Sequence, residues 1–505
     1  MAAVEATGTG QGTLVGAEKA KLRKVLGRFD LVLFTACAIV GLDTIAAAAQ
    51  GGAQSITWLA ISLVVFLIPY GMLVAELGAA FPVEGGPYEW ARMSFGRAVG
   101  AVTAVLYWLS NPLWVGGTLT AATIASLNSF VLTKPLSTTW EIVIGLAFIW
   151  VTTGIAIIAF RVGKWGPNIG TFVKIAVVGL FTVLFIVDIA QHGRPHGTSA
   201  AGDFKPSLSG FLTVIGVLVF MWVGFELSTG AAEEMRNPRR DVPAMIVRSG
   251  LLAAALYALV IVGIILVIPK SQLSSVSGFA HAFTNVSATF HSRALDWLFA
   301  ALVIVTLVGS GAVWLEGADR TQAIAALDGA APAWMGRFTS FGTPIAVNLS
   351  SGVLASAMCV VVFVATSGKL ASFFSIMLSL VISSTAVGYI SIFPALLILR
   401  RRYPNAQRPY RVPGGALGAW AAVIISEVFV LVTAVTLLWP GAINNLFGQS
   451  YSIESVYSVS RPFFEWVTLG SLAAMIALGL VFWVLGERKL RAGLTGITIS
   501  VEPGD

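Results

Sequence analysis

The chain consists largely of apolar segments of about 20 residues separated by short polar connections. A helix of that length spans the hydrocarbon core of a bilayer, and a helix satisfies all its backbone hydrogen bonds internally. The pattern therefore predicts an all-α integral membrane protein with about twelve transmembrane helices. The expected spans are residues 29–50, 57–79, 98–130, 139–160, 168–190, 208–231, 243–268, 295–318, 344–365, 368–399, 416–438 and 464–486.

Two of these spans are interrupted by a glycine followed closely by an acid. Val40-Gly41-Leu42-Asp43 lies in the first span and Val223-Gly224-Phe225-Glu226 in the sixth. A carboxylate at the centre of a spanning helix costs about 3 kcal/mol, and glycine weakens a helix by up to about 1 kcal/mol. We therefore expect both helices to be discontinuous, and we interpret the two interruptions as functional.

The interruptions fall in the first helix of each of two candidate repeats, spans 1–5 and spans 6–10. An odd number of crossings turns the second repeat upside down, which brings the two breaks together near the membrane midplane. Secondary transporters often have this construction, with the substrate site at the paired breaks. If spans 1–5 and 6–10 are the two repeats, the paired breaks mark the substrate site.

Composition and charge agree with a membrane location. Of 505 residues, 57% are apolar and 11% charged, against roughly 25% charged in a soluble domain. Most of the 31 Lys and Arg lie in the N-terminal tail and in connections that follow even-numbered spans. Because positive charge stays on the cytoplasmic side, we expect both termini to be cytoplasmic, in the plasma or inner membrane. The net charge of +7 reflects this bias and indicates lipid headgroups, not nucleic acid, as the partner.

The expected organisation has four parts. Residues 1–28 form a cytoplasmic tail without the features of a removable signal peptide, and residues 29–399 form the transport core of helices 1–10. Residues 400–486 hold a cytoplasmic loop and helices 11–12, and residues 487–505 form a second cytoplasmic tail. The pattern does not specify an oligomeric state.

No arrangement of residues in the sequence indicates catalysis. Nucleophile elbows, paired carboxylates and phosphate-binding loops are missing, so we expect no catalytic residues and no enzyme. Cys37 and Cys359 lie within predicted spans. His192 and His196 have a spacing that could hold a metal, but their loop has no cysteine or acid cluster. We expect no cofactor and no metal site.

Several motifs carry a resemblance to the amino acid-polyamine-organocation permeases. The matching segments, in the family's order and spacing, are Ala75-Glu76-Leu77, Phe81-Pro82, Gly85-Gly86-Pro87-Tyr88, Gly224-Phe225-Glu226, Asn237-Pro238-Arg239-Arg240, Phe393-Pro394-Ala395 and Arg408-Pro409-Tyr410-Arg411-Val412-Pro413-Gly414. The resemblance runs over most of the chain. It implies the LeuT-like five-plus-five inverted-repeat fold with two extra C-terminal helices, alternating access, and a small amino acid or amine as substrate.

The resemblance also implies how the substrate is held. In the family, the unwound first helix offers backbone N–H groups to a substrate carboxylate, and carbonyls around the sixth-helix break take the amino group. Helix termini carry partial charges of the matching signs. The substrate-binding residues implied in this way are Gly41, Leu42, Asp43 and Thr44 on one side, and Phe220, Trp222, Val223, Gly224 and Phe225 on the other. For Phe220 and Trp222, simple filling of the bundle core is the alternative interpretation.

Asp43 departs from the family's pattern, which usually reads Gly-Ser-Gly-Ile-Phe at the first break. An ionised Asp43 would repel a carboxylate that arrives at the same N–H groups. Three interpretations remain: Asp43 is protonated and takes part in proton coupling, it pairs with the ammonium group of a cationic amine, or it caps the second half-helix.

Lys174 and Glu226 are the candidate proton-coupling residues. Lys174 matches a fifth-helix lysine that, in sodium-independent members of the resembling family, fills the space of the sodium ion, which argues against sodium coupling. Its alternative is a lysine whose amine reaches the headgroups. Glu226 is the matching acid of the sixth span, and its alternative is a structural link to nearby backbone. Tyr389 and the serines of the tenth span are further polar candidates that the sequence does not rank.

The sequence thus predicts a secondary active transporter for a small amino acid or amine, working by proton-coupled symport or by substrate exchange, without sodium. Two alternatives are an amino-acid sensor of the same fold that does not transport, and a permease specific for cationic amines or polyamines. Tails of about 28 and 19 residues are too short for a soluble output domain of the usual size, which disfavours the sensor.

Overall fold

The computed structural model describes residues 27–162, 165–193, 201–235, 237–269, 273–290, 292–340 and 342–491. Most of both predicted tails, and also His196, lie outside the described residues. Within those ranges every regular element is a helix, as predicted. Eleven described helices are long and apolar enough to cross a membrane. The predicted first span is not among the eleven because a break divides it into α2 (Arg28–Ile39) and α3 (Ile45–Ala49).

The remaining spans follow the predicted order with boundaries shifted by a few residues. The second span consists of α4 (Ala53–Ser62), a π-helical turn (Leu63–Leu67) and α5 (Ile68–Ala80). The third combines α7 (Arg97–Trp114), η2 (Val115–Leu119), α8 (Thr120–Ser126) and η3 (Leu127–Val131). The others are α9 (Thr138–Val162), α10 (Trp165–His192), α11 (Leu208–Trp222) with η5 (Phe225–Glu234), α12 (Pro238–Val267), α14 (Arg293–Leu327), α15 (Ile345–Ala365), α16 (Leu370–Arg402), α17 (Gly415–Leu438) and α20 (Arg461–Arg491).

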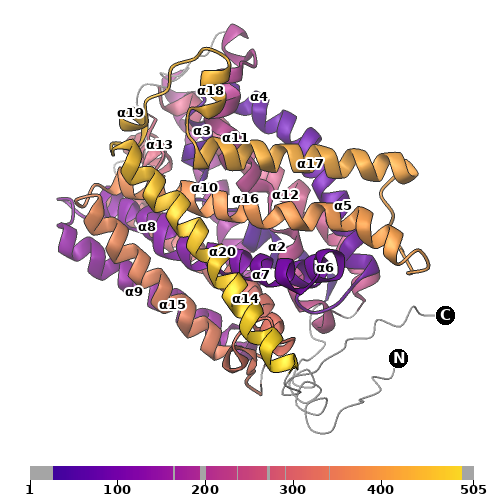
Figure 1. Cartoon of the computed structure of the whole chain (residues 1–505). Coiled ribbons are helices and arrows are strands. Elements are labelled where there is room, and N and C mark those ends of the chain that lie inside the picture. Colours follow the sequence, from indigo (N-terminus) through magenta and orange to yellow (C-terminus); the bar gives the residue numbers. More distant parts are fainter. Residues whose placement is uncertain are drawn as a thin grey trace.

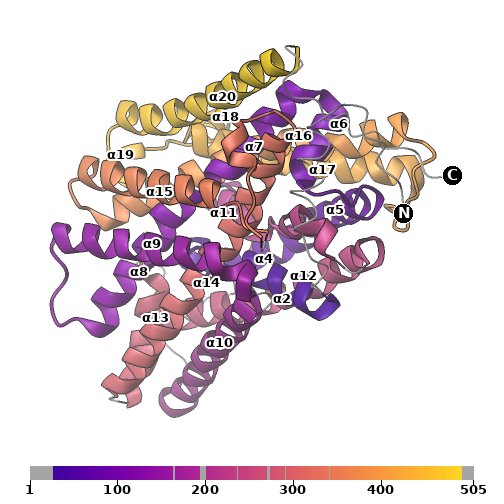
Figure 2. The same cartoon turned by 90° about the horizontal axis from the view of Figure 1, so that it is seen from below.

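Two short helices lie in connections at opposite ends of the bundle (Figures 1 and 2). Helix α6 (Gly86–Phe95) follows α5, and α13 (Gly278–Ser287) precedes α14. We call the two ends the α6 face and the α13 face. The predicted orientation makes the α6 face cytoplasmic, because it also carries the arginine-rich connection between α16 and α17.

Helix α2 lies inside the bundle, where it packs against α10, α12 and α14. Nine of its twelve residues are buried, from Asp30 to Ile39. By contrast, α20 runs along the periphery over α7 and α16 (Figure 2). The two predicted breaks therefore sit in the centre of the protein, and the C-terminal helices form part of its outer layer.

Candidate functional site around the two helix breaks

The first break has the position and length that the sequence predicts. Helix α2 ends at Ile39, Val40 is extended, and α3 begins at Ile45. A Cβ atom at Gly41 would lie 2.9 Å from Oδ1 of Asp43, so a larger residue there would displace the Asp43 side chain. Residues 41–44 are all buried. The break therefore lies within the protein interior, away from lipid.

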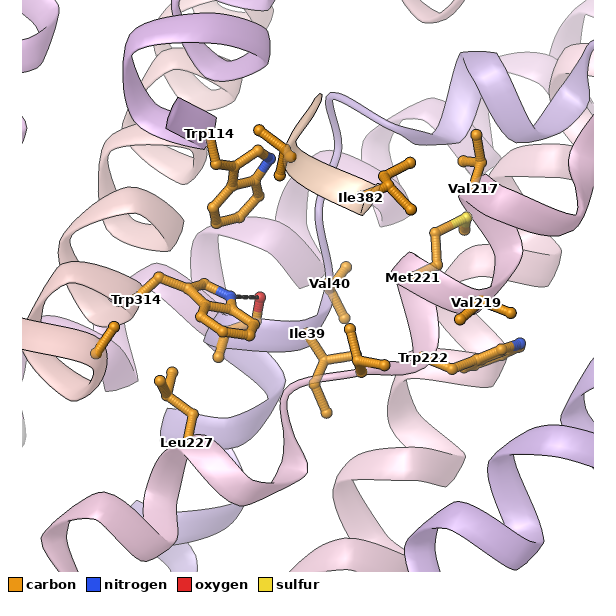
Figure 3. Close-up of a cluster of buried hydrophobic side chains, with 14 of the residues drawn as sticks. Ile39, Val40, Trp114, Val217, Val219, Met221, Trp222, Leu227, Trp314 and Ile382 are labelled. Atoms are coloured by element: carbon orange, nitrogen blue, oxygen red, sulfur yellow. Dashed lines mark hydrogen bonds between the residues drawn. The ribbon is translucent and has the colours of Figure 1, made fainter. Parts of the chain in front are cut away.

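The second break separates α11 from η5. Val223 is extended, and Gly224 has a φ of +122°, which an L side chain rarely adopts. A Cβ at Gly224 would lie 2.7 Å from the Trp314 ring and 3.4 Å from Cγ1 of Ile39. The two breaks are therefore in contact, as the predicted repeat arrangement requires. Figure 3 shows Ile39 and Val40 between Trp314 on one side and Trp222 on the other.

The C-terminal carbonyls of α2 are satisfied by side chains from three other helices. A helix leaves its last four carbonyls without an intrahelical partner. The Trp314 indole donates to the Ala38 carbonyl at 2.8 Å, the contact dashed in Figure 3. The Tyr257 hydroxyl donates to the Ile39 carbonyl at 2.5 Å. The end of α2 is thus closed to a ligand by the protein itself.

Lys174 on α10 completes this arrangement. Its ammonium donates to the carbonyls of Cys37 and, at 2.6 Å, Val40, and to the Ser310 hydroxyl at 2.5 Å. The side chain is 0% exposed, so the alternative that its amine reaches the headgroups is wrong. A cation at a helix C-terminus is favourable. Lys174 therefore joins α10, α14 and the broken first span.

Glu226 lies in a cage of three tyrosine hydroxyls. Oε1 accepts from Tyr107 at 3.0 Å and from Tyr389, and Oε2 accepts from Tyr70. The Tyr70 hydroxyl also accepts hydrogen bonds from the N–H groups of Gly224 at 3.0 Å and of Phe225 at 3.3 Å. The alternative interpretation of Glu226 is a link to nearby backbone. In the structure its carboxylate accepts hydrogen bonds from side chains of three other helices. Because the cage joins α5, α7 and α16 to the second break, a change in the charge of Glu226 would act on all of them.

Asp43 has a different environment. Its Oδ2 accepts hydrogen bonds from the Trp114 indole at 2.8 Å and the Thr118 hydroxyl at 2.7 Å. Its Oδ1 is buried and has no hydrogen-bond partner among the described residues. The N-cap of α3 is Thr44, and it has no side-chain cap hydrogen bond. The capping interpretation therefore lacks the contact it needs.

Three aromatic rings surround this part of the site. Trp114 packs in a T-shaped arrangement against Phe220 and against Trp314, with 6.0 Å between ring centroids in each pair. Trp222 points elsewhere: its indole donates to Ser62 at 2.9 Å, and in Figure 3 its ring is directed away from Val40 and Trp314. Phe220 thus lies beside the breaks as predicted, but only the backbone of Trp222 borders them.

The carbonyls at the second break are less occupied than those at the first. The Val223 N–H donates to the Phe220 carbonyl at 3.3 Å. Among the described residues, none donates a hydrogen bond to the carbonyls of Met221, Trp222 or Val223. That these carbonyls receive the ammonium group of a substrate stays a prediction.

Towards the α13 face, phenylalanine rings cover the first break. Phe130, Phe279, Phe283 and Phe299 are buried, and Phe299 lies 5.3 Å from Phe130 and 5.5 Å from Phe279 between ring centroids. Beneath them a cavity of about 20 Å³ is lined by Asp43 among others, which is the volume that one water molecule needs. The phenylalanine rings therefore leave little space beside the first break on this side.

Towards the α6 face, ionic contacts replace the aromatic rings. Arg320 lies 3.7 Å from Glu84, and Tyr88 donates to Asp328, which also lies 3.4 Å from Arg97. Burial, together with the nearby Asp328 carboxylate, raises the pKa of Tyr88 well above its ordinary value, so the hydroxyl stays a donor. These contacts link the connection after α5 to the end of α14.

Sequence reasoning placed the breaks, Lys174 and Glu226 correctly in one region. It did not identify Tyr70, Tyr257 or Trp314. A usable signal existed for the two tyrosines, because each is the single tyrosine of its apolar span, 29 to 33 residues after the glycine of a break. Trp314 has no such signal, since an aromatic residue in an apolar helix is ordinarily core.

A family model for amino acid permeases matches residues 26–453. The chain belongs to the amino acid permease family. The resemblance noted from the motifs is thereby confirmed, and this permease is a multi-pass membrane transporter.

Three similar proteins illustrate the range of the family. An uncharacterized transporter of Legionella pneumophila is 29% identical over 78% of this chain and 85% of its own length. A probable agmatine/putrescine antiporter of Lactococcus lactis is 29% identical, over 82% of this chain and 89% of its own. A branched-chain amino acid permease of Bacillus subtilis is 25% identical over 93% and 94%. This permease is thus similar both to a protein named for amines and to one named for amino acids.

Proposed function

We propose that this permease is a secondary active transporter of a small amine, and that Asp43 binds the ammonium group of the substrate. The observation that carries this proposal is the environment of Asp43. Its carboxylate is 3% exposed, receives hydrogen bonds only from neutral groups, and has one oxygen without a partner. A buried carboxylate without a counter-charge is costly. An ammonium group of the substrate provides that charge.

Lys174 does not supply the counter-charge at hydrogen-bonding distance, because its three hydrogen bonds go to Cys37, Val40 and Ser310. The surroundings of Asp43 also favour a cation. Trp114 and Trp314 lie close by, and tryptophan rings attract cations. The carbonyls of residues 221–223, which receive no described hydrogen bond, can accept hydrogen bonds from an ammonium group. The similarity to a probable agmatine/putrescine antiporter supports the same class of substrate.

The proposed transport mode is exchange or proton symport without sodium. The Lys174 ammonium is fixed among backbone carbonyls, which are oxygen ligands of the kind that bind cations. Its positive charge takes the role of an ion there, so no sodium is needed. Glu226 is the proposed proton site, because its cage of hydroxyls joins three helices to the second break.

A zwitterionic amino acid is the second candidate substrate. The N–H groups of the turn at Leu42–Thr44 are of the kind that bind a carboxylate, and one relative is named a branched-chain amino acid permease. An amino acid would need both the ammonium site and these N–H groups, with its carboxylate close to Asp43.

Uptake into reconstituted vesicles tests the proposal. The variant Asp43→Asn keeps the shape of the side chain but removes its charge, so we expect uptake of agmatine or putrescine to fall by at least about tenfold, the effect of a hydrogen bond to a charged group. Glu427→Gln is the matched control, because it neutralises another carboxyl within a span, and no hydrogen bond or ion pair among the described residues links Glu427 to the breaks. Unchanged amine uptake by Asp43→Asn would refute the role of Asp43.

A further inference from the structure

Each break is contacted by a tyrosine hydroxyl from the other predicted repeat. Tyr70 belongs to α5, in the first predicted repeat, and contacts the break of the second repeat. Tyr257 belongs to α12, in the second predicted repeat, and contacts the break of the first. Each hydroxyl accepts a hydrogen bond of 3.0 Å from the N–H group of the break glycine, Gly224 or Gly41.

The two hydroxyls differ in the group to which they donate. Tyr70 donates to the Glu226 carboxylate, so its position depends on the proposed proton site. Tyr257 donates to the Ile39 carbonyl at 2.5 Å, which is fixed backbone. Its ring is 0% exposed and packs edge-on against Trp222 at 5.7 Å between centroids. Tyr257 is therefore held firmly in place, with its oxygen on the N–H group of Gly41.

The position of this oxygen matters because of where a substrate carboxylate would go. In an α-amino acid the ammonium and carboxylate groups share one carbon atom, so they lie only a few ångströms apart. With the ammonium on Asp43, the carboxylate falls beside Gly41, whose Cβ position is 2.9 Å from Oδ1 of Asp43. The Gly41 N–H would be its natural donor, but the Tyr257 hydroxyl already occupies that donor.

The Tyr257 hydroxyl cannot easily give way or serve as a donor to the carboxylate. Its only proton goes to the Ile39 carbonyl. Redirecting that proton leaves a buried carbonyl unpaired, which is unfavourable. A substrate that lacks the carboxylate makes no such demand, and the hydroxyl stays in place.

We propose that Tyr257 is a specificity-determining residue that excludes a carboxylate from the first break, so that this permease prefers an amine to the amino acid with the same side chain. The inference rests on the proposed binding of an ammonium group at Asp43. Selection then comes from a blocked hydrogen-bond donor, which is an unfavourable feature for the rejected substrate.

The experiment compares pairs of probes that differ only in the carboxylate: agmatine with arginine, and isobutylamine with valine. Binding of each to the purified permease is measured by calorimetry. We expect the wild type to bind each amine at least about tenfold more tightly than its amino acid, and Tyr257→Phe to reduce this ratio by about tenfold. Tyr457→Phe is the matched control, because it removes another buried hydroxyl, bonded to Ser379 and remote from both breaks. It should leave the ratio unchanged.

An unchanged ratio in folded Tyr257→Phe would overturn the inference while leaving the proposed function intact. A second measurement applies even if that variant does not fold. In the wild type, arginine methyl ester, which has no carboxylate charge, should bind more tightly than arginine, and equal binding overturns the inference. If none of the probes binds the wild type, the proposed function itself fails, which is a different result from an unchanged ratio.

Discussion

The most informative perturbation of the first break is Lys174→Met, which keeps the approximate length of the side chain but removes its charge and its donors. Three hydrogen bonds disappear, to Cys37, Val40 and Ser310. The two carbonyls would remain buried at the end of α2, and each unpaired buried group costs about 1–3 kcal/mol. The simple sum is therefore about 2–6 kcal/mol of stability.

Two features of the structure lower this expected loss of stability. Ser310 already lies 3.4 Å from the Cys37 carbonyl and can donate to it when the lysine is absent, so that only the Val40 carbonyl stays unpaired. Removal of a buried charge also recovers part of its desolvation cost. We therefore expect a loss of about 2 kcal/mol, which weakens the end of α2 and leaves the permease folded.

Thermal unfolding in detergent and uptake into vesicles are the two assays. Lys174→Met should have a lower melting temperature than the wild type, and its uptake should no longer respond to a proton gradient. Uptake by the wild type should be the same with and without sodium. Lys369→Met is the control, because Lys369 is exposed at the start of α16. If Lys174→Met has the melting temperature and the proton coupling of the wild type, the role of Lys174 at the end of α2 is refuted. Strict sodium dependence of the wild type would refute the proposal that the Lys174 ammonium takes the role of an ion.

Two further variants test the second break. Glu226→Gln removes the charge to which three tyrosines donate. Uptake should then no longer respond when the proton gradient is collapsed, whereas substrate binding in calorimetry should remain. Wild-type coupling in this variant would refute the proton role of Glu226. Gly224→Ala places a Cβ at a φ of +122° and 2.7 Å from the Trp314 ring, which should cost at least about 1–3 kcal/mol and lower the melting temperature. Gly179→Ala, where no atom lies within 4 Å of the added Cβ, is its control, and equal melting of the two variants would contradict the strain.

The membrane fold could be predicted because its cause is local. Each span must satisfy its backbone within itself and present apolar side chains over about 20 residues, and both requirements are visible in the order of residues. The same reasoning located the breaks, because Gly41 with Asp43 and Gly224 with Glu226 are costly in a spanning helix. The division into a core of residues 29–399 and a C-terminal part of residues 400–486 stays a prediction.

The partners of the site could not be predicted, since they come from helices far apart in the chain. Asp43 is bound by Trp114 and Thr118, which the sequence treats as ordinary members of an apolar third span. Lys174 and Ser310 are 136 residues apart and meet at the end of α2. Trp222, assigned to the substrate, instead donates to Ser62, because the direction of a side chain at a helix end depends on the neighbouring helix.

The sequence by itself thus determined the number of spans, the two breaks and the presence of charged groups inside the membrane, since all three follow from the cost of polar groups in hydrocarbon. Only the tertiary structure decided which of those groups are already satisfied. Tyr257, Trp314 and Lys174 occupy the carbonyls of the first break, whereas Asp43 keeps an unpaired oxygen. The physical reason is that a hydrogen bond needs two groups within about 3 Å, and only packing of distant segments brings them that close.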